Sequence, residues 1–264
     1  MINMKVVILC GGKGTRLRDH TEMPKALVEI GNKPVLRHIM EHYAHYGFNE
    51  FIICLGYKGE MIKQYFLENK WRDNNLTIDK EEVDYHNLKR EDWKITLVDT
   101  GKESTKAERL KCVEGFIKEG GDRFFVSYGD DLSNVNLKKL LEFHKAHGKI
   151  ATLTTIQPVN QYGVINFDEE NPDIIKEFKE KPKMSDWING GFFVLNTSIF
   201  DYINPGEELE KEVAEKLTKE KQLQAYRHPG FWKTMNTLKE VQELNQLSGE
   251  LPWKKFEDDM KEEE

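Results

Sequence analysis

Residues 6–16 read V-V-I-L-C-G-G-K-G-T-R, and no other stretch of the sequence indicates the fold as clearly. Its first half is a short apolar run, which is typical of a strand buried on both faces of a parallel sheet. Its second half is a glycine turn that ends in Thr15 and Arg16. Backbone N–H groups of such a turn can approach a phosphate closely, because no Cβ stands in the way. The stretch therefore predicts a strand leading into an anion-binding turn, where Arg16 adds a bidentate cation.

A glycine-rich strand exit is also typical of dinucleotide-binding proteins, so the turn alone leaves two kinds of ligand open. The turn reads G-G-x-G-T-R rather than G-x-G-x-x-G. The acid that binds a ribose hydroxyl about 20 residues further on is not clearly present. Pro24-Lys25 follows instead. A second cation after the turn favours phosphate binding over dinucleotide binding.

The composition describes a globular chain with a polar surface. The 264 residues are 38% hydrophobic and 32% charged, and no apolar run of about 18 residues predicts a membrane span. The formal net charge of −7 disfavours non-specific binding to nucleic acid. The N-terminus lacks the pattern of a signal peptide. Cys10, Cys54 and Cys112 have no metal-binding spacing. Cys10 and Cys54 lie in apolar strand-like runs and suit buried thiols in a reducing cytoplasm, where we expect the protein to act.

Strand and helix patterns alternate through about residue 150 and then change. We expect strands at 5–10, 51–55, 94–98 and 123–128, and helices at 34–46, 59–69, 105–118 and 136–146. Residues 71–93 are polar and are expected to form a long excursion. Later strands are expected at 151–156, 163–167, 174–178, 192–195 and 223–226, with helices at 207–220 and 238–247. The pattern predicts an α/β fold: a Rossmann-like, doubly wound, mostly parallel sheet with additional mixed strands in the second half.

Ligands of such sheets bind at the carboxyl ends of the strands. Gly129-Asp130 follows the apolar strand expected at 123–128, so Asp130 is placed to hold Mg²⁺ with a hard carboxylate oxygen. The alternative is a turn or helix-capping aspartate, a role that Asp131 or Ser133 can also fill. His38 and His42 stand four residues apart on one helix, but no third ligand is spaced to complete a zinc site, which favours a structural role.

The glycine turn followed by Pro24-Lys25 resembles the signature of the sugar-phosphate nucleotidyltransferases. Later segments, in the same order along the chain, resemble the glucose-1-phosphate cytidylyltransferases, a branch of that family: residues 56–59, 93–101, 128–130, 143–149, 188–196 and 228–232. The resemblance extends from Met4 to about Trp253. It implies transfer of CMP from CTP to a hexose 1-phosphate, with glucose 1-phosphate as the expected acceptor, giving a CDP-sugar and pyrophosphate for surface-polysaccharide precursors.

The same resemblance implies Mg²⁺ as cofactor, CTP and the hexose 1-phosphate as partners, and a homo-oligomer that needs neither nucleic acid nor membrane. No linker-like stretch divides the chain, so we expect one domain over residues 1–253, with a nucleotide-binding half at about 4–150, a sugar-phosphate-binding half at about 151–253 and a charged tail at 254–264. Residue by residue, the resemblance assigns catalysis to Arg16, Lys25 and Lys181, and nucleotide binding to Leu9, Gly11, Gly12, Gly14, Thr15, Arg109 and Gly129. It assigns sugar binding to Tyr128, Glu180, Asn189 and Gly190, and metal binding to Asp130 and Asn236.

Three places depart from the family pattern. Asn236 stands where the family usually has a second metal-binding aspartate, and residues 106–109 read K-A-E-R where cytidylyl relatives carry Thr-Gly-Gly-Arg. The loop between Arg16 and Lys25 is one residue shorter than usual. These departures leave two alternatives: a nucleotidyltransferase with a different nucleotide or sugar phosphate, and a catalytically weakened nucleotide-binding module.

Overall fold

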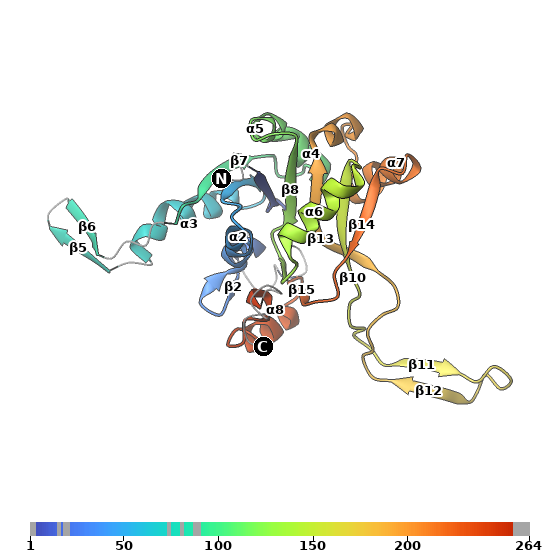
Figure 1. Ribbon diagram of the computed structural model, residues 1–264. Coiled ribbons are helices and arrows are strands. Elements are labelled where there is room, and N and C mark those ends of the chain that lie inside the picture. The colour runs from blue at the N-terminus through green and yellow to red at the C-terminus, as the bar shows by residue number, and fades with distance from the viewer. Residues whose placement is uncertain are drawn as a thin grey trace, which may run out of the picture.

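A seven-stranded sheet forms the centre of the computed structural model, which describes residues 4–14, 17, 22–72, 75–79, 82–86 and 91–255 (Figure 1). The strand order is β14-β10-β13-β8-β1-β4-β7. All pairings are parallel except those of β13 with β8 and β10. The predicted α/β fold, with a mostly parallel sheet and mixed strands in the second half, is confirmed. The strand bounds are β1 (Lys5–Leu9), β4 (Glu50–Leu55), β7 (Lys94–Asp99), β8 (Arg123–Tyr128), β10 (Ala151–Ile156), β13 (Ile188–Asn196) and β14 (Leu223–Arg227).

Strand β1 divides the interior into two cores. Val6 and Ile8 point into one core and Val7 into the other, because successive side chains of a strand face opposite sides. One face of the sheet is covered by α2 (Val35–His45), α3 (Gly59–Arg72) and α6 (Leu137–His147), and α8 (Leu238–Gln246) adds apolar side chains to the same core. The other face is covered by α4 (Lys106–Cys112), α5 (Glu114–Lys118) and α7 (Ala214–Lys219). Burial on both faces explains why β1 reads as an unbroken apolar run.

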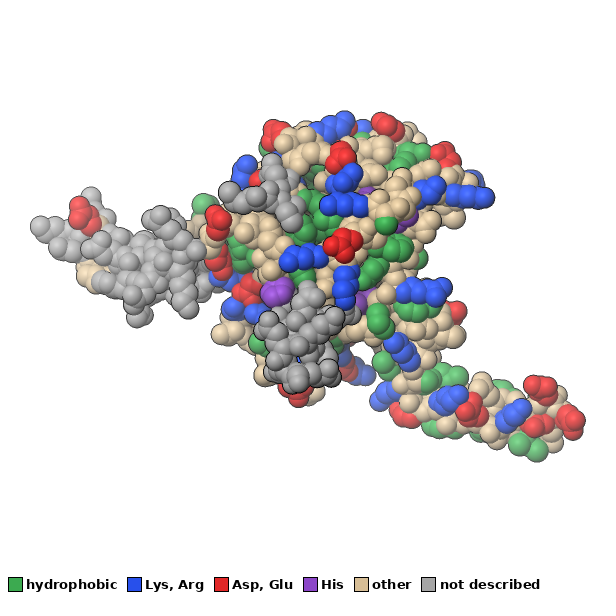
Figure 2. Space-filling model, in the orientation of Figure 1, with side chains coloured by type: hydrophobic (Ala, Val, Ile, Leu, Met, Phe, Trp, Pro, Cys, Tyr) green, Lys and Arg blue, Asp and Glu red, His purple; other side chains and the backbone are tan. Residues whose placement is uncertain are grey.

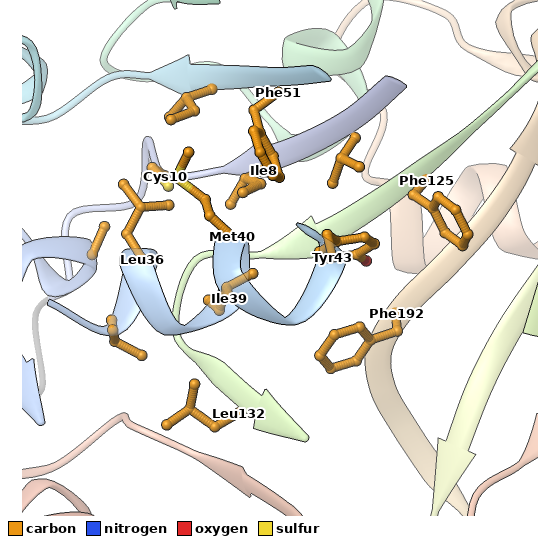
Figure 3. Packing of buried hydrophobic residues seen from close by; sticks show 14 of the residues in the cluster. Ile8, Cys10, Leu36, Ile39, Met40, Tyr43, Phe51, Phe125, Leu132 and Phe192 are labelled. Atoms are coloured by element: carbon orange, nitrogen blue, oxygen red, sulfur yellow. The ribbon is translucent and has the colours of Figure 1, made fainter. Parts of the chain in front are cut away.

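Helix α2 shows how the helical period anchors the sheet. Its buried side chains recur on one stripe that faces the strands, and Tyr43 meets Phe125 of β8 edge to face at a ring distance of 5.3 Å (Figure 3). Each fully buried aromatic or aliphatic side chain of this kind contributes about 1.5–3 kcal/mol through apolar burial. The apolar side chains that meet in this core include Ile8, Leu36, Ile39, Met40, Phe51 and Phe192.

The structure differs from the sequence-based expectation at several elements. The helix expected at 105–118 is divided at Val113 into α4 and α5, and the one expected at 207–220 begins as the short helical segment η3 (Leu209–Val213) before α7. The excursion at 71–93 contains a hairpin, β5 (Asn75–Asp79) and β6 (Glu82–His86), whose charged composition obscures the strand period. Strands β11 (Val164–Phe167) and β12 (Ile175–Lys179) pair with each other and form a ribbon that projects from the body (Figure 1).

Two small antiparallel strand pairs were not predicted. Strand β9 (Asp131–Ser133) pairs with β15 (Trp232–Thr234), while β2 (Glu29–Ile30) pairs with β3 (Lys33–Pro34). Just beyond the β9–β15 ladder, the backbone N–H of Met235 donates to the carbonyl of Asp130 at 2.9 Å. The β9–β15 pair thereby joins the residues that follow β8 to a segment about one hundred residues later in the sequence. In the part of the chain described here, no helix has the length and apolar character needed to cross a membrane.

Candidate active site

A cavity of about 560 Å³ opens where β1 and β8 end. Its volume lies within the range of small-molecule sites, and its position is the one expected for ligands of parallel sheets. Sequence-predicted residues of both halves of the chain meet there. Those lining the cavity are Leu9, Gly11, Gly12, Gly14, Lys25, Arg109, Tyr128, Gly129, Asp130, Asn189 and Asn236. Thr15 and Arg16 lie outside the described residues.

Three polar side chains meet at the floor of the cavity, and we call them the Lys25 cluster: Lys25, Asp130 and Asn236. The Lys25 ammonium lies 3.1 Å from Asp130 Oδ2 and donates to Asn236 Oδ1 at 2.7 Å. Two oxygens, one from the exit of β8 and one from the residues after β15, therefore converge on a single cation. Asn236 is held in this orientation because its Nδ2 donates to Thr234 Oγ1 at 2.8 Å.

Hard oxygen donors that converge on one point also fit a divalent metal. Mg²⁺ is typically held by one or two protein carboxylates together with water and substrate phosphates, so Asp130 and Asn236 are a sufficient protein donor set. The described residues contain no cluster of three or more His, Cys, Asp or Glu side chains that would form a metal site by protein ligands alone. A metal at this position would compete with the Lys25 ammonium for the same oxygens.

Asp131 adds a second carboxyl group that the sequence assigned only to capping. It lies opposite Thr234 in the β9–β15 ladder and is 4% exposed. Burial and the neighbouring Asp130 carboxylate raise the pKa of Asp131 well above its usual value, which favours its protonated form. The cluster therefore concentrates its negative charge on Asp130.

The glycine turn is held from behind by Arg109. Gly11 has no room for a side chain, because a Cβ there would lie 2.1 Å from Arg109 Nη1. The guanidinium donates to the carbonyls of Gly11 at 3.1 Å and Leu55 at 3.1 Å. It also donates to Thr100 Oγ1 at 2.8 Å and to the Gly101 carbonyl at 2.7 Å. Arg109 was predicted to bind nucleotide; it lines the cavity, but its donors are directed at the protein backbone around the turn.

The opposite wall carries the residues that the sequence assigned to the sugar. Asn189 and Tyr128 line the cavity and are joined by a hydrogen bond from Asn189 Nδ2 to the Tyr128 hydroxyl at 3.0 Å. Gly190 lies behind Asn189, where its carbonyl accepts from the Trp232 indole N–H at 2.9 Å. Trp232 also lines the cavity. Neutral amide, hydroxyl and aromatic groups of this kind suit a polyol such as a sugar.

Glu180 and Lys181 are not among the lining residues. They follow β12 at the base of the ribbon, and their side chains, 62% and 55% exposed, form a surface ion pair at 3.4 Å. Lys181 also has a positive φ of 44°, an uncommon backbone conformation for a lysine. Tyr128 and Asn189, assigned to the sugar, therefore line the cavity. Glu180, assigned to the sugar, and Lys181, assigned to catalysis as the cation for the sugar phosphate, do not. Their substrate roles stay predictions.

Several lining residues were missed by sequence reasoning. Ser104, Thr105 and Lys106 enter from the start of α4, and Glu208 enters beside η3. The sequence signal for this wall was the K-A-E-R segment at residues 106–109. It departs from the family pattern, and it includes Arg109, which was already assigned to nucleotide binding. The other lining residues that sequence reasoning did not assign to the site are Cys10, Ala26, Asp131, Ile188 and Thr234.

The histidines of α2 are structural, as their pattern favoured. His38 Nε2 lies 2.9 Å from the carbonyl of Ile30, and His42 Nε2 lies 2.8 Å from that of Val135. Burial lowers the pKa of His42 to about 3, so this imidazole is neutral inside the fold. His42 thereby fixes the segment that follows β9.

Comparison with known proteins identifies the family of the chain. The family model described as nucleotidyl transferase matches residues 5–247. The probable glucose-1-phosphate cytidylyltransferase of Bacillus subtilis is 43% identical over 257 residues, covering 95% of this chain and 99% of that protein. The glucose-1-phosphate cytidylyltransferase of Salmonella typhi is 42% identical over 261 residues, covering 96% and 100%.

The fold is also shared with solved structures. The crystal structure of HddC from Yersinia pseudotuberculosis superimposes with a TM-score of 0.68 at 21% identity, covering 92% of this chain and 98% of that one. At this identity the likeness concerns the fold alone. The family match and the two relatives confirm the resemblance that the glycine turn and Pro24-Lys25 carried. The chain belongs to the nucleotidyl transferase family.

Proposed function

We propose that the protein transfers CMP from CTP to glucose 1-phosphate, forming CDP-glucose and pyrophosphate. The observation that carries this proposal is the Lys25 cluster beside the glycine turn, in a chain 43% identical to a probable glucose-1-phosphate cytidylyltransferase over nearly its whole length. The CDP-sugar would serve the synthesis of surface-polysaccharide precursors in the cytoplasm.

The reaction brings several like charges together, so alignment and neutralisation are the tasks of the protein. An oxygen of the sugar phosphate forms a bond to the α-phosphorus of CTP, and the bond from that phosphorus to the bridging oxygen breaks. Pyrophosphate leaves with the electron pair. The N–H groups of the glycine turn would bind triphosphate oxygens, and Lys25 would neutralise the α-phosphate as a point charge.

Mg²⁺, held by Asp130 and Asn236, would supply further neutralisation of phosphate oxygens when bound. Arg109 would act indirectly, since its hydrogen bonds to Gly11 and Thr100 fix the turn that meets the phosphates. Tyr128 and Asn189 would bind the hexose hydroxyls. Arg16 and Lys181 keep the roles that the resemblance implies, as cations for pyrophosphate and for the sugar phosphate, and Glu180 keeps its role at sugar hydroxyls.

The experiment is a coupled assay of pyrophosphate release with purified protein, CTP, glucose 1-phosphate and Mg²⁺. We expect release that requires all three additions, and CDP-glucose as the second product. A panel of other nucleoside triphosphates and hexose 1-phosphates tests the alternative that the K-A-E-R segment and Asn236 change substrate choice. No release with any pair, under any divalent metal, would refute transferase activity and leave nucleotide binding alone.

A further inference from the structure

A chain of polar contacts crosses the cavity wall from α4 through η3 to β13. The Glu210 carboxylate, on η3, accepts a hydrogen bond from the Tyr128 hydroxyl. The same carboxylate oxygen pairs with the Lys106 ammonium, from the first residue of α4. That ammonium also lies 4.3 Å from the centre of the Tyr128 ring, within the range of a cation–π contact. Three residues far apart in sequence thus hold one another at the wall.

The contacts continue from Tyr128 into the cavity. The Tyr128 hydroxyl accepts from Asn189 Nδ2 at 3.0 Å, and Asn189 Oδ1 accepts from the Gly191 N–H at 2.8 Å. Both ends of the Asn189 amide are therefore oriented, while the amide retains a second N–H and a second lone pair for a ligand. The orientation of Asn189 depends on that of the Tyr128 hydroxyl.

Packing fixes the Tyr128 ring but leaves its hydroxyl to the polar partners. The ring meets Phe193 edge to face at 5.7 Å. Gly191 lies against it so closely that a Cβ there would approach Tyr128 Cδ2 to 2.7 Å. An ionised carboxylate can only accept, so the Tyr128 hydroxyl donates its hydrogen bond to Glu210. The hydroxyl then has one direction in which to accept, and that direction is toward Asn189.

We propose that Glu210 is a positioning residue: through Tyr128 it sets the Asn189 amide to bind hydroxyl groups of the hexose, and Lys106 balances its charge. The inference rests on the proposed function. The hexose is the ligand that fits, because Asn189 offers a neutral donor and acceptor. The phosphates, by contrast, need a cation such as the Lys25 ammonium, and the Asn189 amide is neutral.

Lys106 gives this arrangement to this particular chain. Lys106 is the first residue of the K-A-E-R segment. The cytidylyl pattern has threonine at this position, a neutral side chain that cannot form an ion pair with a carboxylate. The Lys106 side chain is 44% exposed and that of Glu210 29%, so the pair is partly open to solvent. An ion pair so placed adds little stability, and its effect is expected on the position of Tyr128.

The test compares Glu210→Ala, Glu210→Gln and Tyr128→Phe in the pyrophosphate assay, with both Michaelis constants measured separately. We expect Glu210→Ala to raise KM for glucose 1-phosphate about tenfold, while kcat and KM for CTP change by less than about twofold. Glu210→Gln keeps an oxygen that accepts from Tyr128, and should recover most of the loss. The double variant Glu210→Ala/Tyr128→Phe should be no worse than the worse single variant, because both act by one route.

Glu215→Ala, an exposed glutamate on α7, is the matched control and should behave as wild type. An unchanged KM for glucose 1-phosphate in Glu210→Ala would overturn the inference. So would an equal rise in both Michaelis constants, or effects of Glu210→Ala and Tyr128→Phe that multiply. A wild-type protein that releases no pyrophosphate would refute the proposed function instead, which keeps the two failures distinguishable.

Discussion

The Lys25 cluster and the base of the β11–β12 ribbon hold charged residues in opposite ways. In the cluster, the side chains of Lys25 and Asp130 are only 18% and 24% exposed, and their partner Asn236 comes from a distant segment. At the ribbon, Glu180 and Lys181 are 62% and 55% exposed and pair with their own neighbour in sequence. The cluster is positioned by the fold, whereas the ribbon pair is positioned by local chain geometry.

The ribbon differs from the body in its packing as well. Phe167, Ile175 and Phe178 are 54–60% exposed, and Ile165 lies opposite Phe178 in the ribbon. Figure 2 shows hydrophobic side chains at the surface of the projecting ribbon. A two-stranded ribbon without a covering layer is marginally stable. The charges of the cluster are therefore held in place by the fold, whereas Lys181 would have to be brought to the cavity to act on a substrate there.

Asp130→Asn is expected to have the largest effect. The amide still accepts from Lys25, so the fold is preserved, but the negative charge that attracts a divalent cation is lost. We expect kcat/KM to fall about a thousandfold in the pyrophosphate assay, the scale typical of losing one preorganised electrostatic group. Asp122→Asn, an exposed carboxylate just before the start of β8, is the control and should stay within about twofold. A similar loss in both variants would contradict a special role for Asp130.

Acid should weaken the framework behind the cluster, because His42 is neutral when folded. Its folded pKa is about 3, against 6.5 for the free side chain. The contribution of neutral His42 to the stability of the fold is complete above pH 6.5. It is lost as the pH falls toward 3, because in that interval only the unfolded chain binds the proton. We expect the free energy of unfolding to fall by about 2 kcal/mol from this group between pH 7 and pH 5.

Urea unfolding at both pH values measures this loss in wild type and in His42→Gln, which keeps a donor for the Val135 carbonyl. The variant should lose about 2 kcal/mol less than wild type over the same interval. Equal losses would show that His42 does not carry the acid sensitivity.

Lys181→Met tests the ribbon side of the contrast. The resemblance assigns this lysine to the sugar phosphate, and its exposed ammonium, paired only weakly with Glu180, is available to a second anion. If the base of the ribbon delivers it to the cavity, KM for glucose 1-phosphate should rise about tenfold with KM for CTP unchanged. Lys179→Met is the control, because Lys179 is 54% exposed on the same ribbon and pairs with Glu177. Indistinguishable kinetics in the two variants would leave Lys181 a surface residue.

The sequence predicted the body of the fold well because its signals are local. The apolar run of β1 and the stripe on α2 each follow from a period that a few residues define. The β9–β15 pair has three-residue strands, too short for any period, and it joins segments about one hundred residues apart. The approach of Asn236 to Asp130 was therefore expected from the family pattern and not from the residues themselves.

In the candidate site, the sequence likewise predicted the chemical type of the residues but not the contacts of their side chains. Motif reasoning identified Arg109 and Lys181 as cations, but a residue type does not reveal what its side chain meets. Arg109 is 4% exposed and directs its guanidinium at backbone carbonyls, which only the packing of α4 against the glycine turn determines. Glu210 had no motif at all, and only its contact with Tyr128 makes it visible.

Asn236→Asp is the change with the smallest expected effect, and it asks whether the cluster is complete. A carboxylate at this position can still accept from Lys25, so the central contact of the cluster is kept. Because Mg²⁺ prefers charged oxygen ligands, the Mg²⁺ concentration for half-maximal activity should fall about threefold, with little change in kcat. A titration with Mg²⁺ at saturating substrates measures this. If the wild type releases no pyrophosphate and the Asn236→Asp variant does, the natural chain is a weakened nucleotide-binding module. The missing charge at residue 236 would then be what prevents turnover of bound nucleotide.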